Sequence, residues 1–266
     1  MALANILQTR PLGLVFDIDG TLSPIVSTPS EARLYPGVAE LLAEARNYAH
    51  VAIMTGRALA SGAALVNVEG LTYVGTHGAE WCEGLPGTHE IQINPLARPY
   101  LAPGAELLDL AEQELASLPG ILIERKLLGG SVHYRLSPQP EQAHELILTT
   151  LRAAAEARHF HLSEGKRVID IKPIIALNKG TELRSFAQRF QLAGLLFAGD
   201  DRTDLDAALE IERLRQDGLQ AAMIVVQAPD TLPALLEHAD SVVQGVAGMA
   251  QLLNEIVAQL RQGQPG

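Results

Sequence analysis

The feature that most constrains the fold is an alternation of short apolar runs with longer stretches of helical periodicity. Leu12–Phe16 is a continuous apolar run of strand length, and a helical pattern over residues 38–48 separates it from the next run, residues 51–54. The same rhythm returns in the last third of the chain, with apolar runs at residues 195–198 and 222–226. Buried strands joined by helices are typical of a parallel sheet covered on both faces. The sequence therefore predicts an α/β fold with a doubly wound, Rossmann-like parallel sheet.

The middle of the chain interrupts this rhythm. After a proline-rich stretch at residues 94–104, two helical patterns enclose a pair of short strands, residues 121–126 and 131–136, joined by a loop that contains Gly129 and Gly130. A further strand is predicted at residues 167–171. Such a segment inside a parallel α/β domain indicates an inserted α+β cap domain. We expect the core to span residues 1–97 and 172–266, and the cap residues 98–171.

Composition excludes several kinds of partner. The chain has 266 residues, and 20 Lys and Arg against 31 Asp and Glu give a net charge of −11 at pH 7. Binding to a nucleic-acid backbone requires a basic face, so no nucleic-acid partner is expected. The single cysteine, Cys82, excludes an intramolecular disulfide framework and suits a reducing compartment. No apolar stretch reaches the ~18 residues of a membrane span and no signal-peptide pattern begins the sequence. We therefore expect a cytoplasmic protein with no membrane partner.

Two carboxylates directly follow the first predicted strand. Asp17 and Asp19 are two residues apart, so both side chains project to the same side of an extended chain. At the carboxyl end of a parallel strand, that side opens onto the crevice where such sheets bind ligands. Gly20 lets the backbone turn, and Thr21 can hydrogen-bond the turn. Because Asp-Gly pairs are common in turns, this motif alone is also compatible with a purely structural turn.

A second acidic cluster follows a later strand of the same predicted sheet, and therefore lies at the same edge. It consists of Asp200, Asp201 and Asp204. Capping of the helix that follows would explain one carboxylate, whereas this cluster has three. Together with the first motif, five carboxylates would repel one another strongly unless a cation compensates them. Because the cluster contains no Cys or His, its oxygen ligands favour Mg²⁺.

Two further positions provide what an anionic substrate needs. Thr55, Gly56 and Arg57 follow the second strand and precede a helical pattern, so a hydroxyl and free backbone N–H groups can form an anion site there. Thr55 could equally be an N-cap residue. Lys179 precedes another helical pattern, and a lysine beside a metal–carboxylate cluster would offset negative charge. A lone lysine would otherwise be interpreted as solvated surface.

In this order, the four elements resemble those of the haloacid dehalogenase-like phosphatase superfamily. Finer features resemble the trehalose-6-phosphate phosphatase family: DIDGTLSPI at residues 17–25, MTGR at 54–57, GTHGAE at 75–80, HYR at 133–135 and DIKP at 170–173. The resemblance implies a Mg²⁺-dependent phosphatase that hydrolyses a sugar phosphate, trehalose 6-phosphate, on a haloacid dehalogenase-like core with an α+β cap.

The resemblance also implies residue roles. Asp17 would be the nucleophile that forms an aspartyl-phosphate, and Asp19 the general acid and base. Thr55 and Lys179 would hold the phosphate. The Mg²⁺ would be bound by the Asp17 and Asp200 carboxylates and the backbone carbonyl of Asp19. The full set of candidate metal ligands is Asp17, Asp19, Asp200, Asp201 and Asp204.

Candidate substrate-binding residues lie on both predicted domains. They are Gly20, Gly56, Arg57, His77, Gly78 and Glu80 on the core and Glu124, Lys126, His133 and Arg135 on the cap. A single histidine after a strand is often only a packing residue, and the polar cap residues could form a solvated outer face. Two alternative functions stay open: a phosphatase for another sugar phosphate, such as sucrose 6-phosphate or mannosyl-3-phosphoglycerate, and a non-catalytic module that binds a sugar phosphate.

Overall fold

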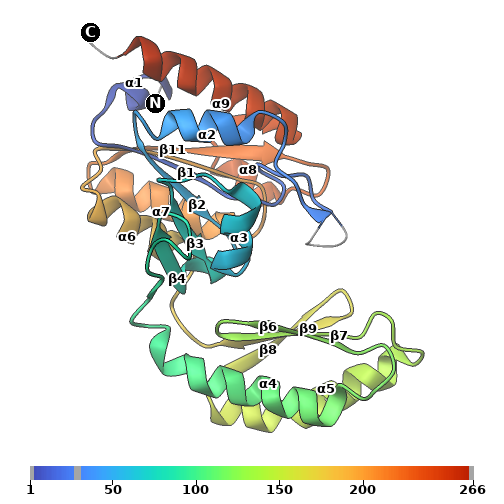
Figure 1. Ribbon diagram of the computed structural model, residues 1–266. Coiled ribbons are helices and arrows are strands. Elements are labelled where there is room, and N and C mark those ends of the chain that lie inside the picture. The colour runs from blue at the N-terminus through green and yellow to red at the C-terminus, as the bar shows by residue number, and fades with distance from the viewer. Residues whose placement is uncertain (1–2, 27–30, 264–266) are drawn as a thin grey trace. The chain divides into compact units, whose positions relative to one another are not determined.

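The computed structural model describes residues 3–26 and 31–263. The chain forms two compact units (Figure 1). The core unit comprises Met1–Gln92 and Leu177–Gly266, and the cap unit comprises Ile93–Ala176. The cap unit therefore begins at residue 93 and ends at residue 176, whereas the limits expected from the sequence are 98 and 171. Each unit has its own cluster of buried apolar side chains.

The large sheet has eight strands in the order β12-β11-β10-β1-β2-β3-β4-β5. Its strands are β1 (Leu12–Phe16), β2 (His50–Met54), β3 (Thr72–Gly75), β4 (Glu80–Glu83), β5 (Gln92–Ile93), β10 (Gly194–Gly199), β11 (Gln220–Gln227) and β12 (Ser241–Gln244). The helices of the core unit are α1 (Leu3–Gln8), α2 (Val38–Ala45), α3 (Leu59–Val66), α6 (Lys179–Arg189), α7 (Asp204–Gln216), α8 (Pro233–Glu237) and α9 (Gly245–Gln262), with the 3₁₀ turn η2 (Thr76–Gly78).

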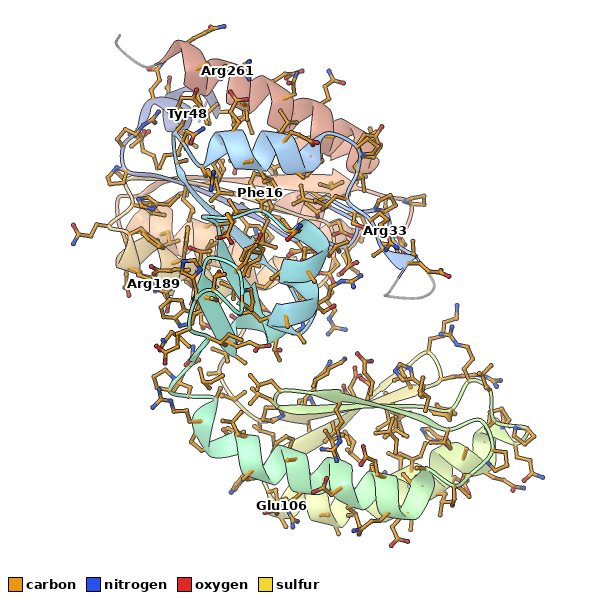
Figure 2. All side chains as sticks on the ribbon, in the orientation of Figure 1. Phe16, Arg33, Tyr48, Glu106, Arg189 and Arg261 are labelled. Carbon is orange, nitrogen blue, oxygen red and sulfur yellow. The ribbon has the colours of Figure 1, made fainter. Side chains whose placement is uncertain are left out.

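Strand β1 lies in the middle of this sheet, parallel to both β10 and β2. Alternate residues of β1 pack against opposite layers: Phe16, labelled in Figure 2, belongs to the cluster that includes residues of α2 and α9, whereas Val15 belongs to the cluster that includes residues of α6 and α7. Because both faces are covered, every residue of β1 is buried, which explains its continuous apolar sequence. The predicted doubly wound α/β core is confirmed.

The cap unit contains an antiparallel sheet of four strands in the order β6-β7-β9-β8. Its elements are η3 (Arg98–Tyr100), α4 (Leu101–Leu115), β6 (Leu122–Lys126), β7 (Gly129–His133), α5 (Pro140–Ala157), β8 (Phe160–Gly165) and β9 (Val168–Pro173). The apolar cluster of this unit joins Val132 and Ile169 of the sheet to Leu108 of α4 and Ile147 of α5. One face of the sheet is thus covered by two helices, as in the α+β cap that the sequence predicts.

Three details of the cap differ from the sequence-based prediction. Gly129 and Gly130 belong to strand β7, not to the loop, because they pair with Lys126 and Arg125 of β6. A Cβ on Gly130 would lie 2.2 Å from the Glu124 carbonyl oxygen, so this pairing requires glycine. Strand β7 accordingly ends at His133, and Arg135 lies in the turn beyond it. The predicted strand over residues 131–136 is therefore wrong at its end, and Arg135 does not follow His133 along the strand. Strand β8 was not predicted.

Within residues 3–26 and 31–263, no helix combines the length and the apolar character needed to cross a bilayer. Cys82 lies buried in β4 as a free thiol.

Candidate active site

The first acidic motif leaves β1 in a tight turn. Asp17 is buried, and its backbone N–H still donates to the Ala198 carbonyl of β10 at 3.0 Å, so the sheet fixes its position. The chain then turns through Gly20, which has a φ of +86°. A Cβ on Gly20 would lie 1.9 Å from Asp200 Oδ2. The glycine is therefore required both by the backbone conformation and by the carboxylate that lies against it.

The second acidic motif is organised by Asp204, the first residue of α7. Its Oδ2 accepts the backbone N–H groups of Asp200 and Asp201 at 2.9 and 3.0 Å, and its Oδ1 accepts Lys179 Nζ at 2.6 Å. Both oxygens are thus engaged by this chain. Asp201 Oδ1 accepts the backbone N–H and the hydroxyl of Thr203, each at 2.8 Å, which caps the start of the helix. Capping therefore accounts for Asp201, and Asp204 fixes the loop.

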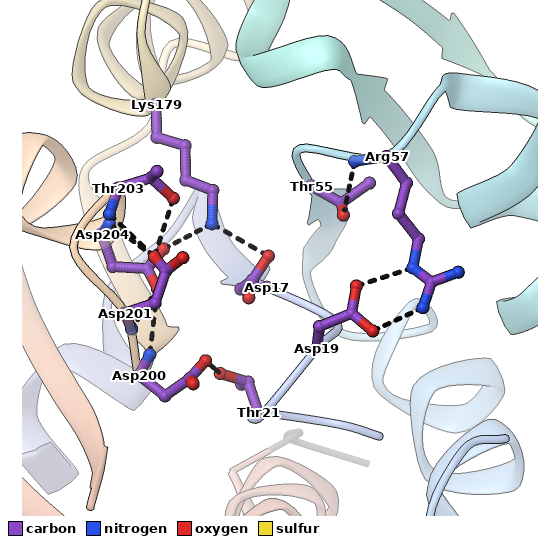
Figure 3. A network of polar contacts seen from close by, with 10 residues as sticks. All are labelled: Asp17, Asp19, Thr21, Thr55, Arg57, Lys179, Asp200, Asp201, Thr203 and Asp204. Atoms are coloured by element: carbon purple, nitrogen blue, oxygen red, sulfur yellow. Dashed lines mark hydrogen bonds and ion pairs between the residues drawn. The ribbon is translucent and has the colours of Figure 1, made fainter. Parts of the chain in front are cut away.

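Lys179 joins the two acidic motifs. It is the first residue of α6, its side chain is 1% exposed, and Nζ lies 2.9 Å from Asp17 Oδ1 and 2.6 Å from Asp204 Oδ1. Figure 3 shows the ammonium group between these two carboxylates. Burial alone would lower the pKa of Lys179, but the charges of Asp17 and Asp204 raise it above its ordinary value. The lysine is therefore charged at neutral pH, and the interpretation as solvated surface is excluded.

The carboxylates of Asp17, Asp200 and Asp204 form a buried group that could hold a metal ion. Each offers an oxygen atom, and these atoms lie within 4.8 Å of one another. One ammonium faces three carboxylates, so negative charge is in excess. Burial, followed by the charge of Asp204, raises the pKa of Asp200 to about 7, and burial raises that of Asp17 well above its usual range. An all-oxygen group with uncompensated charge fits a hard divalent cation.

Asp19 takes a different partner. Arg57 Nε and Nη2 each lie 2.6 Å from one of its carboxylate oxygens, so the two side chains form a bidentate ion pair (Figure 3). The side chain of Asp19 is 37% exposed and that of Arg57 14%. The predicted metal candidates Asp19 and Asp201 thus direct their carboxylates to Arg57 and Thr203, outside the group of Asp17, Asp200 and Asp204.

The loop after β2 holds Thr55, Gly56 and Arg57 beside the acidic motifs. Thr55 is buried, and its Oγ1 accepts the Arg57 N–H at 3.2 Å. Thr55 is not an N-cap residue, because α3 begins at Leu59 with Ala58 as its N-cap. Two hydrogen bonds from η2 fix this loop: the N–H of Thr76 donates to the Arg57 carbonyl at 2.8 Å, and the N–H of His77 donates to the Thr55 carbonyl at 3.1 Å.

The remaining core candidates support this loop. His77 has a φ of 54°, and a Cβ on Gly56 would lie 2.5 Å from its ring, so the imidazole packs against Gly56. Gly78 has a φ of 105°. Glu80, expected from the sequence to contact substrate, is buried, and its Oε1 accepts the Leu59 N–H at 2.8 Å and the Thr76 hydroxyl at 3.0 Å. Glu80 therefore caps α3, a role not expected from the sequence.

Three of the four cap candidates, Glu124, Lys126 and His133, lie on the sheet face opposite the apolar cluster. Glu124 Oε2 lies 3.2 Å from His133 Nε2, and Lys126 Nζ lies 3.0 Å from Ser131 Oγ. The Ser131 hydroxyl donates to Asp170 Oδ1 at 2.6 Å. We call Glu124, Lys126, Ser131, His133 and Asp170 the polar cap face.

Ser131 and Asp170 were not predicted as candidates. Their signal was present in the pairing pattern, since Ser131 lies opposite both Glu124 and Asp170 in register. Arg135 is not part of this face; its Nη2 lies 3.4 Å from the Lys166 carbonyl.

Comparisons with known proteins agree with this geometry. Residues 15–231 match the sequence model of the family described as trehalose-phosphatase. The trehalose-phosphate phosphatase of Mycobacterium leprae (strain TN) is 32% identical over 216 residues, which cover 78% of this chain and 49% of that protein. The protein of the same name from Mycobacterium avium (strain 104) is 31% identical over 232 residues, 85% of this chain and 57% of that protein. This chain thus spans about half the length of these curated relatives.

Solved structures show the same fold. A structure described as a trehalose-6-phosphate phosphatase related protein superposes with a TM-score of 0.73 at 23% identity, covering 95% of this chain and 100% of that chain. The C-terminal domain of the Candida albicans trehalose-6-phosphate phosphatase also gives a TM-score of 0.73, at 20% identity, covering 96% and 95%. A haloacid dehalogenase-like hydrolase from Bacteroides thetaiotaomicron gives 0.61 at 12% identity, covering 93% of this chain and 100% of that chain. The haloacid dehalogenase-like fold class predicted from the sequence is confirmed.

Proposed function

The chain belongs to the trehalose-phosphatase family, and from this premise we propose that it is a Mg²⁺-dependent phosphatase that hydrolyses trehalose 6-phosphate to trehalose and phosphate. The observation that carries the proposal is the buried Lys179 ammonium, which lies 2.9 Å from Asp17 and 2.6 Å from Asp204 beside Asp200. The charged lysine and the three carboxylates are buried together where β1 and β10 end and α6 and α7 begin, and they leave negative charge in excess. They suit a site that accepts a metal ion and a phosphoryl group together.

Asp17 is the proposed nucleophile. It attacks the phosphorus, the bond from phosphorus to the ester oxygen of the sugar breaks, and Asp19 gives its proton to that oxygen. Water then attacks the phosphorus of the aspartyl-phosphate, Asp19 takes up the proton of the water, and the bond between phosphorus and Asp17 breaks to release phosphate. Splitting the hydrolysis into two steps in this way replaces one difficult displacement with two easier ones.

The other core residues hold these groups. We propose that Lys179 and Thr55 bind the phosphoryl oxygens, and that Asp204 keeps Lys179 and the backbone of Asp200 in place through its two engaged oxygens. The Asp17 and Asp200 carboxylates and the backbone carbonyl of Asp19 would hold Mg²⁺. When bound, Mg²⁺ supplies positive charge that offsets the charge of the phosphoryl group.

The polar cap face is the proposed recognition surface for the sugar. Its support is chemical: this side of the antiparallel sheet carries polar contacts, Glu124 with His133 and Lys126 with Ser131, and these groups can form hydrogen bonds with sugar hydroxyls instead. We further propose that the core unit, residues 1–92 and 177–266, performs the catalysis and that residues 93–176 act as its cap. We also propose that the protein works in the cytoplasm, in keeping with the free thiol of Cys82.

The test is phosphate release from a panel of sugar phosphates with Mg²⁺: trehalose 6-phosphate, sucrose 6-phosphate, mannosyl-3-phosphoglycerate and glucose 6-phosphate. The proposal predicts the highest kcat/KM for trehalose 6-phosphate. A higher value for another member would reassign the substrate within the same chemistry. Tight binding of trehalose 6-phosphate without phosphate release would instead favour the non-catalytic binding module.

A further inference from the structure

Arg57 contacts a different group from the one that its position in the sequence suggests. An arginine after a threonine in a loop beside a phosphate site is expected to bind the phosphate. In this structure its Nε and Nη2 atoms instead each lie 2.6 Å from one oxygen of Asp19. Such a fork-to-carboxylate contact fixes both the distance and the plane of the carboxyl group.

The arginine is itself held firmly. Its backbone N–H donates to Thr55 Oγ1 at 3.2 Å, and its carbonyl accepts the Thr76 N–H at 2.8 Å. Its side chain is 14% exposed, less than half the 37% of Asp19. Arg57, which is more buried and held by its backbone, thus sets the position of the more exposed Asp19.

Asp19 needs such an anchor for its proposed role. A group that gives a proton to the leaving oxygen and then takes one from water must present a carboxyl oxygen to nearly the same place in both steps. Asp19 lies in the turn between Ile18 and Gly20, where its backbone forms an isolated bridge with Ser23, but this backbone bridge does not direct the carboxyl group. The described contacts that do so are those from Arg57.

We propose that Arg57 is a positioning residue. It holds Asp19 in the place from which Asp19 protonates the departing sugar, and it does not bind the phosphoryl group of the substrate. The inference rests on the proposed function of Asp19 as general acid. When Asp19 turns one oxygen toward the leaving group, one of the two hydrogen bonds from Arg57 breaks and the other continues to hold the carboxyl group.

The test compares two leaving groups. The sugar oxygen of trehalose 6-phosphate must be protonated as it leaves, whereas the phenolate of p-nitrophenyl phosphate leaves without much assistance. The value of kcat/KM reports only the steps up to formation of the aspartyl-phosphate, so the later use of Asp19 as a base does not enter. Wild type, Arg57→Ala, Arg57→Lys, Asp19→Asn and the double variant Asp19→Asn/Arg57→Ala are each measured with both substrates, and their melting temperatures are compared.

We expect Arg57→Ala to lower the ratio of kcat/KM for trehalose 6-phosphate to that for p-nitrophenyl phosphate by about tenfold to hundredfold, which is part of the roughly 10²–10⁴-fold that general acid catalysis contributes. Arg57→Lys should restore little of this ratio, because an ammonium keeps the charge but lacks the fork. In the Asp19→Asn background, Arg57→Ala should change the ratio less than about threefold, because the residue through which it acts is already disabled.

An equal loss on both substrates, or a full additional loss in the Asp19→Asn background, would overturn the proposal and make Arg57 a phosphate ligand. Failure of the proposed function would be recognised separately. If wild type does not hydrolyse trehalose 6-phosphate, the same comparison is made with glycerol 3-phosphate, whose alkyl leaving group makes the same demand on Asp19.

Discussion

The carboxylate of Asp200 lies directly against the α-carbon of Gly20, so that a Cβ at Gly20 would come within 1.9 Å of Asp200 Oδ2 and 2.4 Å of its Cγ. The two acidic motifs, which are separated by most of the chain, thus pack so closely that no methyl group fits between Gly20 and Asp200. The position of a proposed metal ligand depends on the absence of a side chain at Gly20.

Gly20→Ala should therefore abolish most of the activity and weaken Mg²⁺ binding, because Asp200 must move. The matched control is Gly37→Ala. Gly37 has a φ of 84°, close to the 86° of Gly20, but nothing lies within 4 Å of its missing Cβ. Both variants carry the cost of a left-handed alanine, about 1–2 kcal/mol. Titration calorimetry with Mg²⁺ should show a loss in Gly20→Ala alone; equal affinities in the two variants would disprove the argument.

Mg²⁺ binding should weaken as the pH falls from 8 to 6. Without metal, burial and the charge of Asp204 raise the pKa of Asp200 to about 7, so at pH 6 a proton must leave this carboxyl group before the metal can bind. Titration calorimetry in two buffers of different ionisation enthalpy measures that proton release. Asp200→Asn should bind Mg²⁺ weakly and melt, without metal, no lower than wild type. An affinity that is constant between pH 6 and 8 would contradict the expectation.

Glu182 should make the metal-free protein less stable as the pH rises toward 7. Burial raises the pKa of this carboxyl group to about 7, despite the charge of Arg189, whose Nη2 lies 3.3 Å away. Between its ordinary pKa of 4.5 and about 7, the folded chain binds a proton that the unfolded chain has lost, so the free energy of unfolding falls across this window and levels off above it.

Urea denaturation of wild type and Glu182→Gln at pH 5 and pH 8 measures this effect. The difference in unfolding free energy between the two pH values should become smaller in Glu182→Gln, because the amide does not titrate. An unchanged difference would show that Glu182 does not titrate in this window.

Glu124→Ala should lower kcat/KM for trehalose 6-phosphate by roughly tenfold or more, because hydrogen bonds to charged groups contribute about 1.5–3 kcal/mol each. A small ester such as p-nitrophenyl phosphate, which offers no sugar hydroxyls, should be hydrolysed almost as before. Glu141, an exposed acidic residue of α5 in the same unit, provides the matched control Glu141→Ala. Equal losses on both substrates would indicate a folding defect, and no loss on either would remove Glu124 from sugar recognition.

Much of the fold could be predicted because buried parallel strands are recognisable as continuous apolar runs. β1, β2 and β10 have such runs, and the acidic motifs follow two of them directly. Strand β8 has no comparable signal: its sequence FHLSEG alternates, but only Phe160 is fully buried. The strand is defined by its pairing with β9, a tertiary contact.

The residues of the site could be predicted better than their contacts. The carboxylates, Lys179 and Thr55 were candidates because their residue types suit phosphate chemistry. The sequence could not distinguish a buried helix cap from a substrate ligand at Glu80, since both roles need a carboxylate beside a loop. Nor could it reveal that Arg57 pairs with Asp19 across 38 positions of the chain. Such pairings depend on how loops at one sheet edge pack together.

The measurement that tests the central claim most directly is phosphate release from trehalose 6-phosphate by wild type and Asp17→Asn, side by side in Mg²⁺ buffer. An amide cannot attack phosphorus as a carboxylate does, so wild type should release phosphate and Asp17→Asn should release none while melting cooperatively. Release by Asp17→Asn at close to the wild-type rate, in a preparation whose mass excludes deamidation, would contradict the account.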